Sequence, residues 1–502
     1  MHSRCLELKH LNPTQGQPSD RAVDRDRERW RRRVERLEGD LAGKEQRIRE
    51  LEKQVKQLEK DLADASLNST NSSKPPSSDG LAGPQRPRCR KQANRSKRKP
   101  GGQKGHPGHY RVPVEAARVS EVISVVPVRC GGCGKALAEA ARQNNRVGTP
   151  SKYQVVELPP IDARVIEYRC EKVGCPDCGY QTRAKLPAEA RSQTGPRLTA
   201  LVAHLTVVCR MPRRVTQQML EQVLGIRISL GCTQNCWEQV SEAVSEPYKE
   251  LENQLKLEAV LNVDETGWRQ NGEKRWIWAF VAHEFTFYIV ARTRGVAVLE
   301  SLLGAAFQGI LCSDRLPSYL SYHKGQSQLC WAHLKRNFLE IELGQDWRAQ
   351  RFAQDAVVQY AKLFRLWWSF KAGRIDRKQL MRRSIPIQKA FLGLAERWWD
   401  CENRKVANMA NAIGANFERL FCFVDHEGVE PTNNSAEQAL RRAVQWRKTS
   451  FGNRSNAGAV ATARLLTVAQ TCYQQRRSTL AYLTAAVLLH RSGHKFPSLM
   501  NK

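Results

Sequence analysis

Three carboxylates have positions that could support metal-dependent chemistry. Asp264 and Asp314 each end a short apolar run expected to be a buried strand, and Glu437 falls on the first turn of an expected helix that Asn433 or Asn434 could cap. Acids brought together at buried positions repel one another and lose solvation unless a cation compensates. Together they would form an oxygen-rich site suited to Mg²⁺ or Mn²⁺, and two such ions can support an in-line phosphoryl displacement. Taken singly, each acid is an ordinary strand-end or capping residue.

The elements around these acids are expected in a definite order. Three strands form a meander, followed by a helix and a fourth strand, at residues 259–263, 275–282, 285–291, 296–303 and 309–312. With acids at the ends of the first and fourth strands, this order fits a ribonuclease-H-like arrangement. The stretch 331–426 is helical in pattern and rich in Trp, which predicts a large helical insertion ahead of Glu437.

Two C-x-x-C-G strings place four thiols in pairs, Cys130 with Cys133 and Cys175 with Cys178. The Gly after each second Cys permits a tight turn in which two thiolates converge, and two such knuckles can complete a tetrahedral structural zinc site. Cys170 is a competing fifth thiol that could replace one ligand. A redox motif would need one C-x-x-C beside a βαβ unit, and the sequence suggests none. Short β-like runs are expected around these cysteines at 122–128, 153–158 and 164–168.

A heptad repeat occupies the N-terminal part of the chain. One apolar register holds Trp30, Leu37, Leu51, Leu58 and Ala65, and the other holds Val34, Leu41, Ile48, Val55 and Leu62. Charged and amide side chains flank both registers, and Lys44 interrupts them. So narrow an apolar stripe is typical of a coiled coil, in which a partner helix covers it. The alternative is one long solvated helix lying on its own protein.

The charge of the chain favours a polyanionic partner. Its 502 residues include 81 Lys and Arg against 50 Asp and Glu, a formal net charge of +31. No acid occurs over 80–114, where a basic tract lies, or over 438–502. The sequence has no apolar run long enough to span a bilayer and no secretory h-region, and its 15 scattered cysteines do not resemble a disulfide scaffold. We therefore expect a soluble, intracellular protein.

Helical patterns at 196–209, 215–224 and 232–244 follow the cysteine-rich stretch. The last two are joined across a turn at Gly225, which suggests a helix-turn-helix. Plain helical packing explains the same pattern equally well, because any helical hairpin looks alike.

Several longer strings resemble those of a known family. They are Asn-Ser-Ser-Lys-Pro-Pro-Ser-Ser-Asp at 71–79, Gly-Gly-Gln-Lys-Gly-His at 101–106, Val-Asp-Glu-Thr-Gly-Trp at 263–268, Ser-Asp-Arg at 313–315, Cys-Trp-Ala-His-Leu-Lys-Arg at 330–336, Glu-Gly-Val-Glu-Pro-Thr-Asn-Asn at 427–434 and Arg-Lys-Thr-Ser-Phe-Gly at 447–452. Together they resemble the DDE transposases of bacterial insertion sequences, specifically the insertion-sequence-sixty-six family. The resemblance runs from the heptads near Trp30 to about Leu489.

This resemblance implies roles for individual residues. Asp264, Asp314 and Glu437 would be the catalytic triad that binds two Mg²⁺ or Mn²⁺ ions. Phosphate-binding candidates lie just past Glu437 and on the helix after the fourth strand: Arg441, Arg447, Lys448, His333 and Arg336. For the last two, helix packing is an equal alternative. Ser435 and Gln438 stand where the family often has Ala and Arg, and Gln438 removes one cation beside the triad.

The sequence therefore predicts a multidomain α+β protein. Its expected parts are a coiled coil (23–66), a basic linker (67–114), a small zinc-ribbon-like module (115–190), a helical DNA-binding region with a helix-turn-helix (195–255), a ribonuclease-H-like catalytic core (258–330 and 431–455), a helical insertion (331–430) and a basic helical C-terminal region (456–502). The resemblance implies a transposase that binds the terminal inverted repeats of its element and catalyses DNA cleavage and strand transfer.

Its expected partners are element-end and target DNA, a second copy through the coiled coil, and accessory proteins encoded by the same element. No membrane is among these expected partners. The expected location is the bacterial cytoplasm, in association with the nucleoid. The alternative is a zinc-dependent DNA-binding protein or repressor with an inactive nuclease-like domain.

Overall fold

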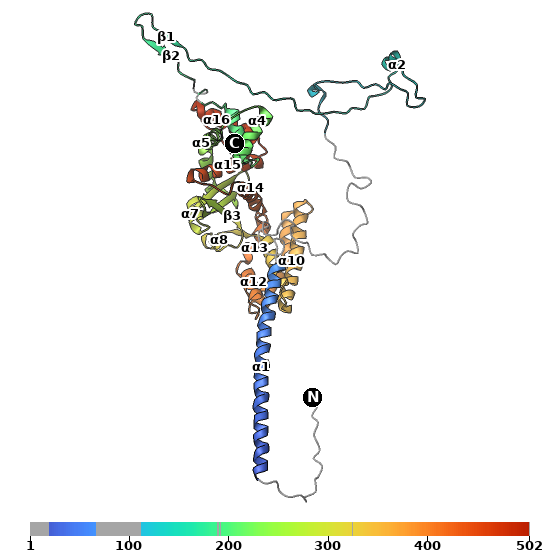
Figure 1. Cartoon of the computed structure of the whole chain (residues 1–502), viewed down its shortest axis with the longest axis vertical. Helices are drawn as coiled ribbons and strands as arrows, with labels where there is room; N and C mark the ends of the chain where they lie inside the picture. Colours follow the sequence, from blue (N-terminus) through green and yellow to red (C-terminus); the bar gives the residue numbers. More distant parts are fainter. Residues whose placement is uncertain (1–19, 67–111, 188–189, 191, 324, 501–502) are drawn as a thin grey trace. The chain divides into compact units, whose positions relative to one another are not determined.

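The computed structural model describes residues 20–66, 112–187, 190, 192–323 and 325–500 (Figure 1). The predicted basic linker at 67–114 lies outside the described residues except for its last three. The chain divides into two compact units, one formed by 1–85 and 328–432 and the other by 86–327 and 433–502. Among the described residues, no helix is long and apolar enough to cross a membrane.

The first unit is helical. Its helices are α1 (Asp20–Ser66), α9 (Trp331–Glu342), α10 (Trp347–Lys371), α11 (Arg377–Trp398), α12 (Arg404–Ala415) and α13 (Phe417–Asp425). The stretch predicted to be helical, 331–426, is therefore confirmed as helical, while its role as an insertion in a catalytic core stays a prediction. Trp331 anchors this bundle, because its buried ring lies 4.9 Å from that of Phe391 and 5.3 Å from that of Phe421.

The single long helix α1 confirms the predicted N-terminal helix. Its large apolar heptad side chains, from Trp30 to Leu62, are all 44–69% exposed. Nothing in this chain covers the stripe among the described residues. The pairing of α1 with a second copy stays a prediction.

The cysteine-rich part of the second unit contains little regular structure. Its elements are η3 (Ala116–Arg118), α2 (Glu139–Asn144), β1 (Lys172–Gly174) and β2 (Gln181–Arg183), and the two strands form an antiparallel hairpin. The β-like runs predicted at 122–128, 153–158 and 164–168 are wrong, since none of them is a strand. Their Val, Ile and Tyr side chains favour strands, but a strand also needs a hydrogen-bonded neighbour, and these exposed segments pair with none that the structure describes.

A group of helices follows, of which the first three lie where the sequence predicted helices. They are α3 (Pro196–Val207), α4 (Arg213–Leu224), α5 (Leu230–Ala243), α6 (Ser245–Gln254) and the short η5 (Leu255–Leu257). Leu220 of α4 packs with Val202 of α3 and Cys236 of α5 in a small core of their own. The expected pair of helices across Gly225 is present, while its use in DNA binding remains a prediction.

A five-stranded sheet in the order β5-β4-β3-β6-β7 forms the centre of the fold. Its strands are β3 (Val260–Gln270), β4 (Glu273–Val281), β5 (Thr286–Ala291), β6 (Ile310–Ser313) and β7 (Ser327–Leu329). The first three pair antiparallel as the predicted meander, and β6 runs parallel to β3. Two further helices, α7 (Val296–Leu303) and α8 (Pro317–Tyr322), lie in the connections around β6. β7 and α8 had no counterpart in the sequence-based prediction.

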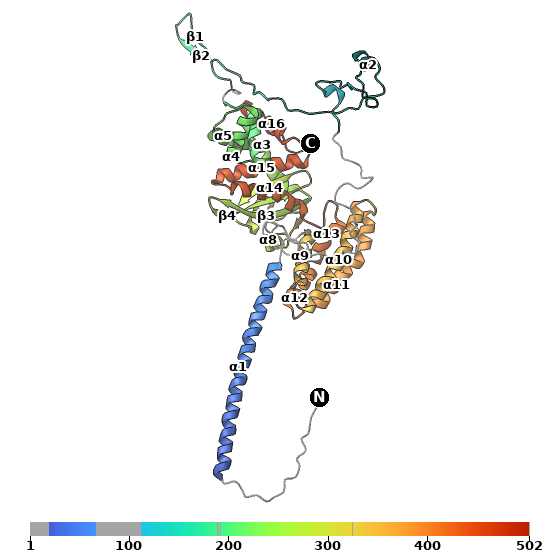
Figure 2. The same cartoon turned by 45° about the vertical axis from the view of Figure 1, so that its right-hand side comes forward.

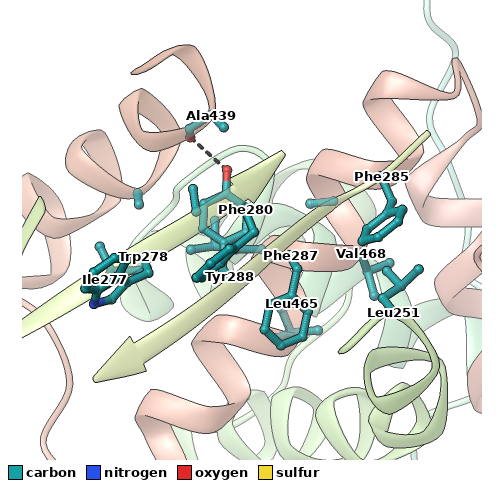
Figure 3. Packing of buried hydrophobic residues seen from close by; sticks show 14 of the residues in the cluster. Leu251, Ile277, Trp278, Phe280, Phe285, Phe287, Tyr288, Ala439, Leu465 and Val468 are labelled. Carbon is teal, nitrogen blue, oxygen red and sulfur yellow. Dashed lines mark hydrogen bonds between the residues drawn. The ribbon is translucent and has the colours of Figure 1, made fainter. Parts of the chain in front are cut away.

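Two helices from the C-terminal part of the chain cover the sheet, α14 (Asn434–Ser450) and α15 (Asn456–Gln474), while α16 (Thr479–Ser492) packs against α3, α5 and α15. Figure 2 shows α14 and α15 beside the strands of the second unit. Tyr288 in the middle of β5 is fully buried, and its hydroxyl donates to the carbonyl of Ala439 on α14 at 2.8 Å (Figure 3). This hydrogen bond ties the sheet to the helix that carries Glu437.

The outer edge of the sheet is closed by threonine hydroxyls on α15. The amides of Thr286 and Tyr288 on the edge strand β5 donate to Thr471 Oγ1 at 3.2 Å and to Thr467 Oγ1 at 3.0 Å. The Thr471 hydroxyl also donates to the carbonyl of Thr286 at 3.2 Å. Backbone groups that would otherwise be left without partners at an edge strand are thus bonded within the chain.

Candidate active site

Asp264, on the interior strand β3, and Asp314, at the end of the neighbouring strand β6, lie beside each other. β3 and β6 are parallel, with Val260 opposite Ile310 and Asn262 opposite Cys312. Continuing this register by two residues places Asp264 beside Asp314, which directly follows β6. The prediction that Asp264 ends its strand is wrong, because β3 continues to Gln270. Beyond Val263 the strict alternation of buried residues is lost, since 264–267 are all half-buried before the buried Trp268, so the sequence pattern did not predict this extension.

The N-terminus of α14 brings Glu437 to the same place. The Asn433 side chain, which is buried, donates from Nδ2 to the carbonyl of Val263 at 2.8 Å, so the start of the helix is fixed to β3 just before Asp264. The amide of Glu437 donates to the carbonyl of Asn433 at 3.2 Å in the first turn. Asn433 occupies the N-cap position, but its side chain bonds to β3 and does not cap the helix.

Electrostatics show that the three carboxylates interact. Burial raises the pKa of Asp264 well above its ordinary value, and the charges of Glu265, Asp314 and Glu437 raise it further. The amide of Glu265, which donates to Asp264 Oδ1 at 2.9 Å, acts in the opposite direction. A site in which negative charge is this unfavourable suits a multivalent cation, since a cation would offset both the burial and the repulsion.

Glu265 is a buried acid for which the sequence predicted no role. Its side chain is 3% exposed, it accepts a short hydrogen bond from the Tyr319 hydroxyl, and it lies 3.3 Å from Arg294. Burial raises its pKa to about 7, against the effect of the Tyr319 hydrogen bond. Glu265 thereby joins β3 to α8 and to the loop after β5, next to both Asp264 and Asp314. Its position beside Asp264 in the sequence was the one available signal, since its partners are distant in the chain.

The phosphate-binding candidates are distributed over both units. Arg441 and Lys448 are exposed on α14, four and eleven residues after Glu437. Because an α-helix turns by about 100° per residue, both side chains lie within about 40° of the helix face that carries Glu437. Arg447 is half-buried and donates to the carbonyl of Gly267, so it also supports β3. His333 and Arg336 are half-buried on α9 of the first unit, and their contact with phosphate stays a prediction.

Both cysteine knuckles adopt the same backbone turn. Cys130 accepts at its carbonyl from the amide of Gly134, and Cys175 accepts from Gly179, each at 2.9 Å. The two glycines have φ near +74° and +73°, which side chains disfavour. Hydrogen bonds from the backbone amides of each turn lower the pKa of the first thiol in each knuckle. The backbone of each knuckle thus favours the thiolate form of its first cysteine, which is the form that binds a metal.

The structure does not bring the knuckles together into one cluster. Among the described residues, no three of Cys130, Cys133, Cys175 and Cys178 have sulfur atoms within 4.8 Å of one another. Cys170, the alternative ligand, is half-buried just before β1. The four-thiolate zinc site therefore stays a prediction.

Comparison with known proteins identifies the family. Residues 191–461 match the family described as Transposase IS66 family, and residues 15–112 match DUF6444, a family of unknown function. No curated protein matches the chain closely. The first match includes α3 to α14, all three carboxylates and the sheet that positions them. Because it covers more than half of the chain, this protein belongs to the IS66 family of transposases.

Proposed function

We propose that this chain binds the terminal inverted repeats of its insertion sequence and catalyses DNA strand cleavage and strand transfer. The observation that carries the proposal is the convergence of Asp264, Asp314 and Glu437 from β3, β6 and α14. The order of the sheet supports a ribonuclease-H-like core, with an antiparallel meander, a parallel fourth strand and a helix that brings the third acid. The shared negative charge at this sheet edge accounts for a need for divalent cations.

The three carboxylates would hold two Mg²⁺ or Mn²⁺ ions. Such ions supply activation of an attacking oxygen and charge neutralisation at the leaving oxygen of a phosphodiester. The protein's own contribution is positioning. Asn433 fixes the helix that carries Glu437 to β3, and the Asp314 carboxylate is oriented by the amide of Leu316, which donates to Oδ1 at 2.9 Å.

Cations on α14 would hold the DNA beside the acids. Arg441 and Lys448 share a face with Glu437 and are exposed, so phosphates of a duplex lying along this face would meet both. Because each bound phosphate releases counterions, we expect affinity for DNA to fall steeply with salt. The helices α4 and α5 and the acid-free stretch 438–502 would extend this contact.

The apolar stripe of α1 would pair two chains. Its heptad side chains are exposed in the single chain, and burial of such a stripe against a second copy is the usual solution. Two paired chains could hold two element ends. Sedimentation of the full chain over a range of concentrations tests this pairing, and a monomer at all concentrations would contradict it.

For the knuckles we propose one structural zinc ion per chain. The purified full chain should contain about one equivalent of zinc by atomic emission, and Cys175→Ser/Cys178→Ser should lose it, because two thiolates are too few for a closed site. Cys209→Ser is the matched control, since Cys209 is an exposed cysteine outside the knuckles. Zinc retained in the double variant would contradict the assignment.

Cleavage of a labelled DNA fragment carrying the element's own end, with Mg²⁺ or Mn²⁺, tests the main proposal. Wild type should nick at the end, and Glu437→Gln should bind with the same salt dependence but not nick. Glu430→Gln, at an exposed acid paired with Lys371 of the first unit, is the matched control and should nick normally.

Binding without nicking by the wild type, both alone and with the accessory proteins of the same element, would contradict the enzyme and favour a repressor with an inactive nuclease-like domain. Nicking that survives in Glu437→Gln would show that Glu437 is not part of the triad.

A further inference from the structure

Phe451 is a large aromatic residue in an unusual place. It follows the last residue of α14, its side chain is 82% exposed, and its φ is +59°. Glycine or asparagine is the ordinary choice at such a left-handed helix end, because a side chain there meets the backbone. The exposed Phe451 side chain therefore adds little hydrophobic stabilisation, and its left-handed backbone conformation costs conformational energy. Such a combination points to a role outside folding.

The backbone around Phe451 is held firmly. A Cβ on the next residue, Gly452, would lie 2.2 Å from the carbonyl oxygen of Arg269 on β3, so the loop passes directly over that strand. Asn453 donates its amide to the same carbonyl at 2.9 Å and accepts from the amide of Asn271 at 2.7 Å. The loop is thereby pinned to the β3–β4 hairpin.

The side chain of Asn453 completes this attachment. Its Oδ1 accepts from the indole of Trp268 at 2.7 Å, and its Nδ2 donates to Thr462 Oγ1 at 2.8 Å. The loop that follows Phe451 is thus bonded both to β3 and to α15. Phe451 is presented from a rigid support.

The surroundings of this ring are basic. Lys448 in the last turn of α14, Arg454 in the loop, and Arg269 and Lys274 of the hairpin are all exposed. The acid of this hairpin, Glu273, already pairs with Arg275 at 2.6 Å. An occupant must therefore offer negative charge together with a flat apolar face. A nucleotide does both, whereas a second copy of this chain would bring its own positive charge.

The distance along α14 relates this ring to the acids. Fourteen residues separate Glu437 from Phe451, which at about 1.5 Å per residue is roughly 21 Å. Base pairs follow one another at about 3.4 Å, so a duplex along this helix would advance about six steps over that length.

We propose that Phe451 stacks on an unstacked base of the element's terminal DNA, about six steps or fewer from the cleaved bond, while Lys448 and Arg454 hold the flanking phosphates. The inference rests on the proposed function and deepens it. Aromatic stacking depends little on base identity, so Phe451 would recognise an unstacked base irrespective of the DNA sequence.

The test uses the full chain and element-end DNA with 2-aminopurine at one position at a time. In the wild type, one position within about six steps of the cleaved bond should change its fluorescence on binding. Phe451→Gly should remove that change and weaken binding between about 5-fold and 150-fold, and Phe451→Trp should restore both. Trp368→Ala, at an exposed aromatic residue on α10 of the first unit, is the matched control and should behave as wild type.

Phe451→Gly also separates stacking from folding. Glycine relieves the left-handed strain, so its thermal midpoint should equal or exceed that of the wild type while DNA binding weakens. On DNA with an abasic site at the responsive position, wild type and Phe451→Gly should bind equally. If the wild type cuts the element end but Phe451→Gly binds as well as wild type, this inference alone is wrong. If the wild type neither binds nor cuts the end, both proposals are wrong.

Discussion

Asp264→Asn is expected to abolish strand cleavage and, in the metal-free protein, to make the fold more stable. The substitution keeps the shape and the acceptor for the Glu265 amide but removes a charge that is buried and repelled by Asp314 and Glu437. We expect a gain of about 1 to 2 kcal/mol in the free energy of unfolding. If Asp264 binds metal as proposed, its loss should lower the cleavage rate by about three orders of magnitude or more, ~4 kcal/mol in the barrier.

Thermal unfolding in a chelating buffer measures the first effect, and the element-end cleavage assay measures the second. Addition of Mn²⁺ should raise the midpoint of the wild type more than that of Asp264→Asn, because the ion stabilises the state that binds it. Asp355→Asn, at an acid paired with Arg351 in the helical unit, should show no gain. A variant less stable than wild type without metal would contradict repulsion among the three acids.

Glu265→Ala is expected to have the largest cost in stability among single substitutions at this sheet edge, about 2 to 3 kcal/mol. It leaves the buried Tyr319 hydroxyl without its acceptor and Arg294 without its carboxylate. Glu265→Gln should stay within about 1 kcal/mol of wild type, because the amide oxygen still accepts from Tyr319 and no charge is buried. Urea denaturation followed by Trp fluorescence measures the free energy of unfolding of both variants. Trp278 reports on this region, because its ring centroid lies 5.9 Å from that of Tyr319 in an edge-on contact.

The control for this series is Glu273→Ala. Its pair with Arg275 is short, but the Glu273 side chain is 62% exposed, so the loss should be below about 1 kcal/mol. Equal losses from Glu265→Ala and Glu273→Ala would show that the Tyr319–Glu265–Arg294 contacts do not hold β3 to α8.

Elements built from local patterns were predictable from the sequence. The helix 296–303 matches α7 exactly, and the order of the meander, helix and fourth strand is as expected, because apolar runs bounded by turn residues are local signals. The three acids stood out for the same reason. Contacts that depend on tertiary packing were not predictable. Glu265 meets Arg294 and Tyr319 only after β3, the loop after β5 and α8 have come together.

In exposed segments the sequence predicted strands that the structure does not contain. The Val-rich run at 122–128 has the composition of a strand but finds no partner in the described structure, and intrinsic preference alone does not make a ladder. The two cysteine knuckles were recognised from spacing, since each is formed within a few residues. Whether they meet depends on the long connection between them, which carries no periodic signal.

The threonines of α15 block strand addition at part of the edge strand β5. Thr467 and Thr471 occupy the backbone groups through which β5 would otherwise accept a strand from another molecule. With the amides of Thr286 and Tyr288 and the carbonyl of Thr286 bonded to α15, this part of β5 cannot add a strand from another molecule, which removes one template for fibrous aggregation.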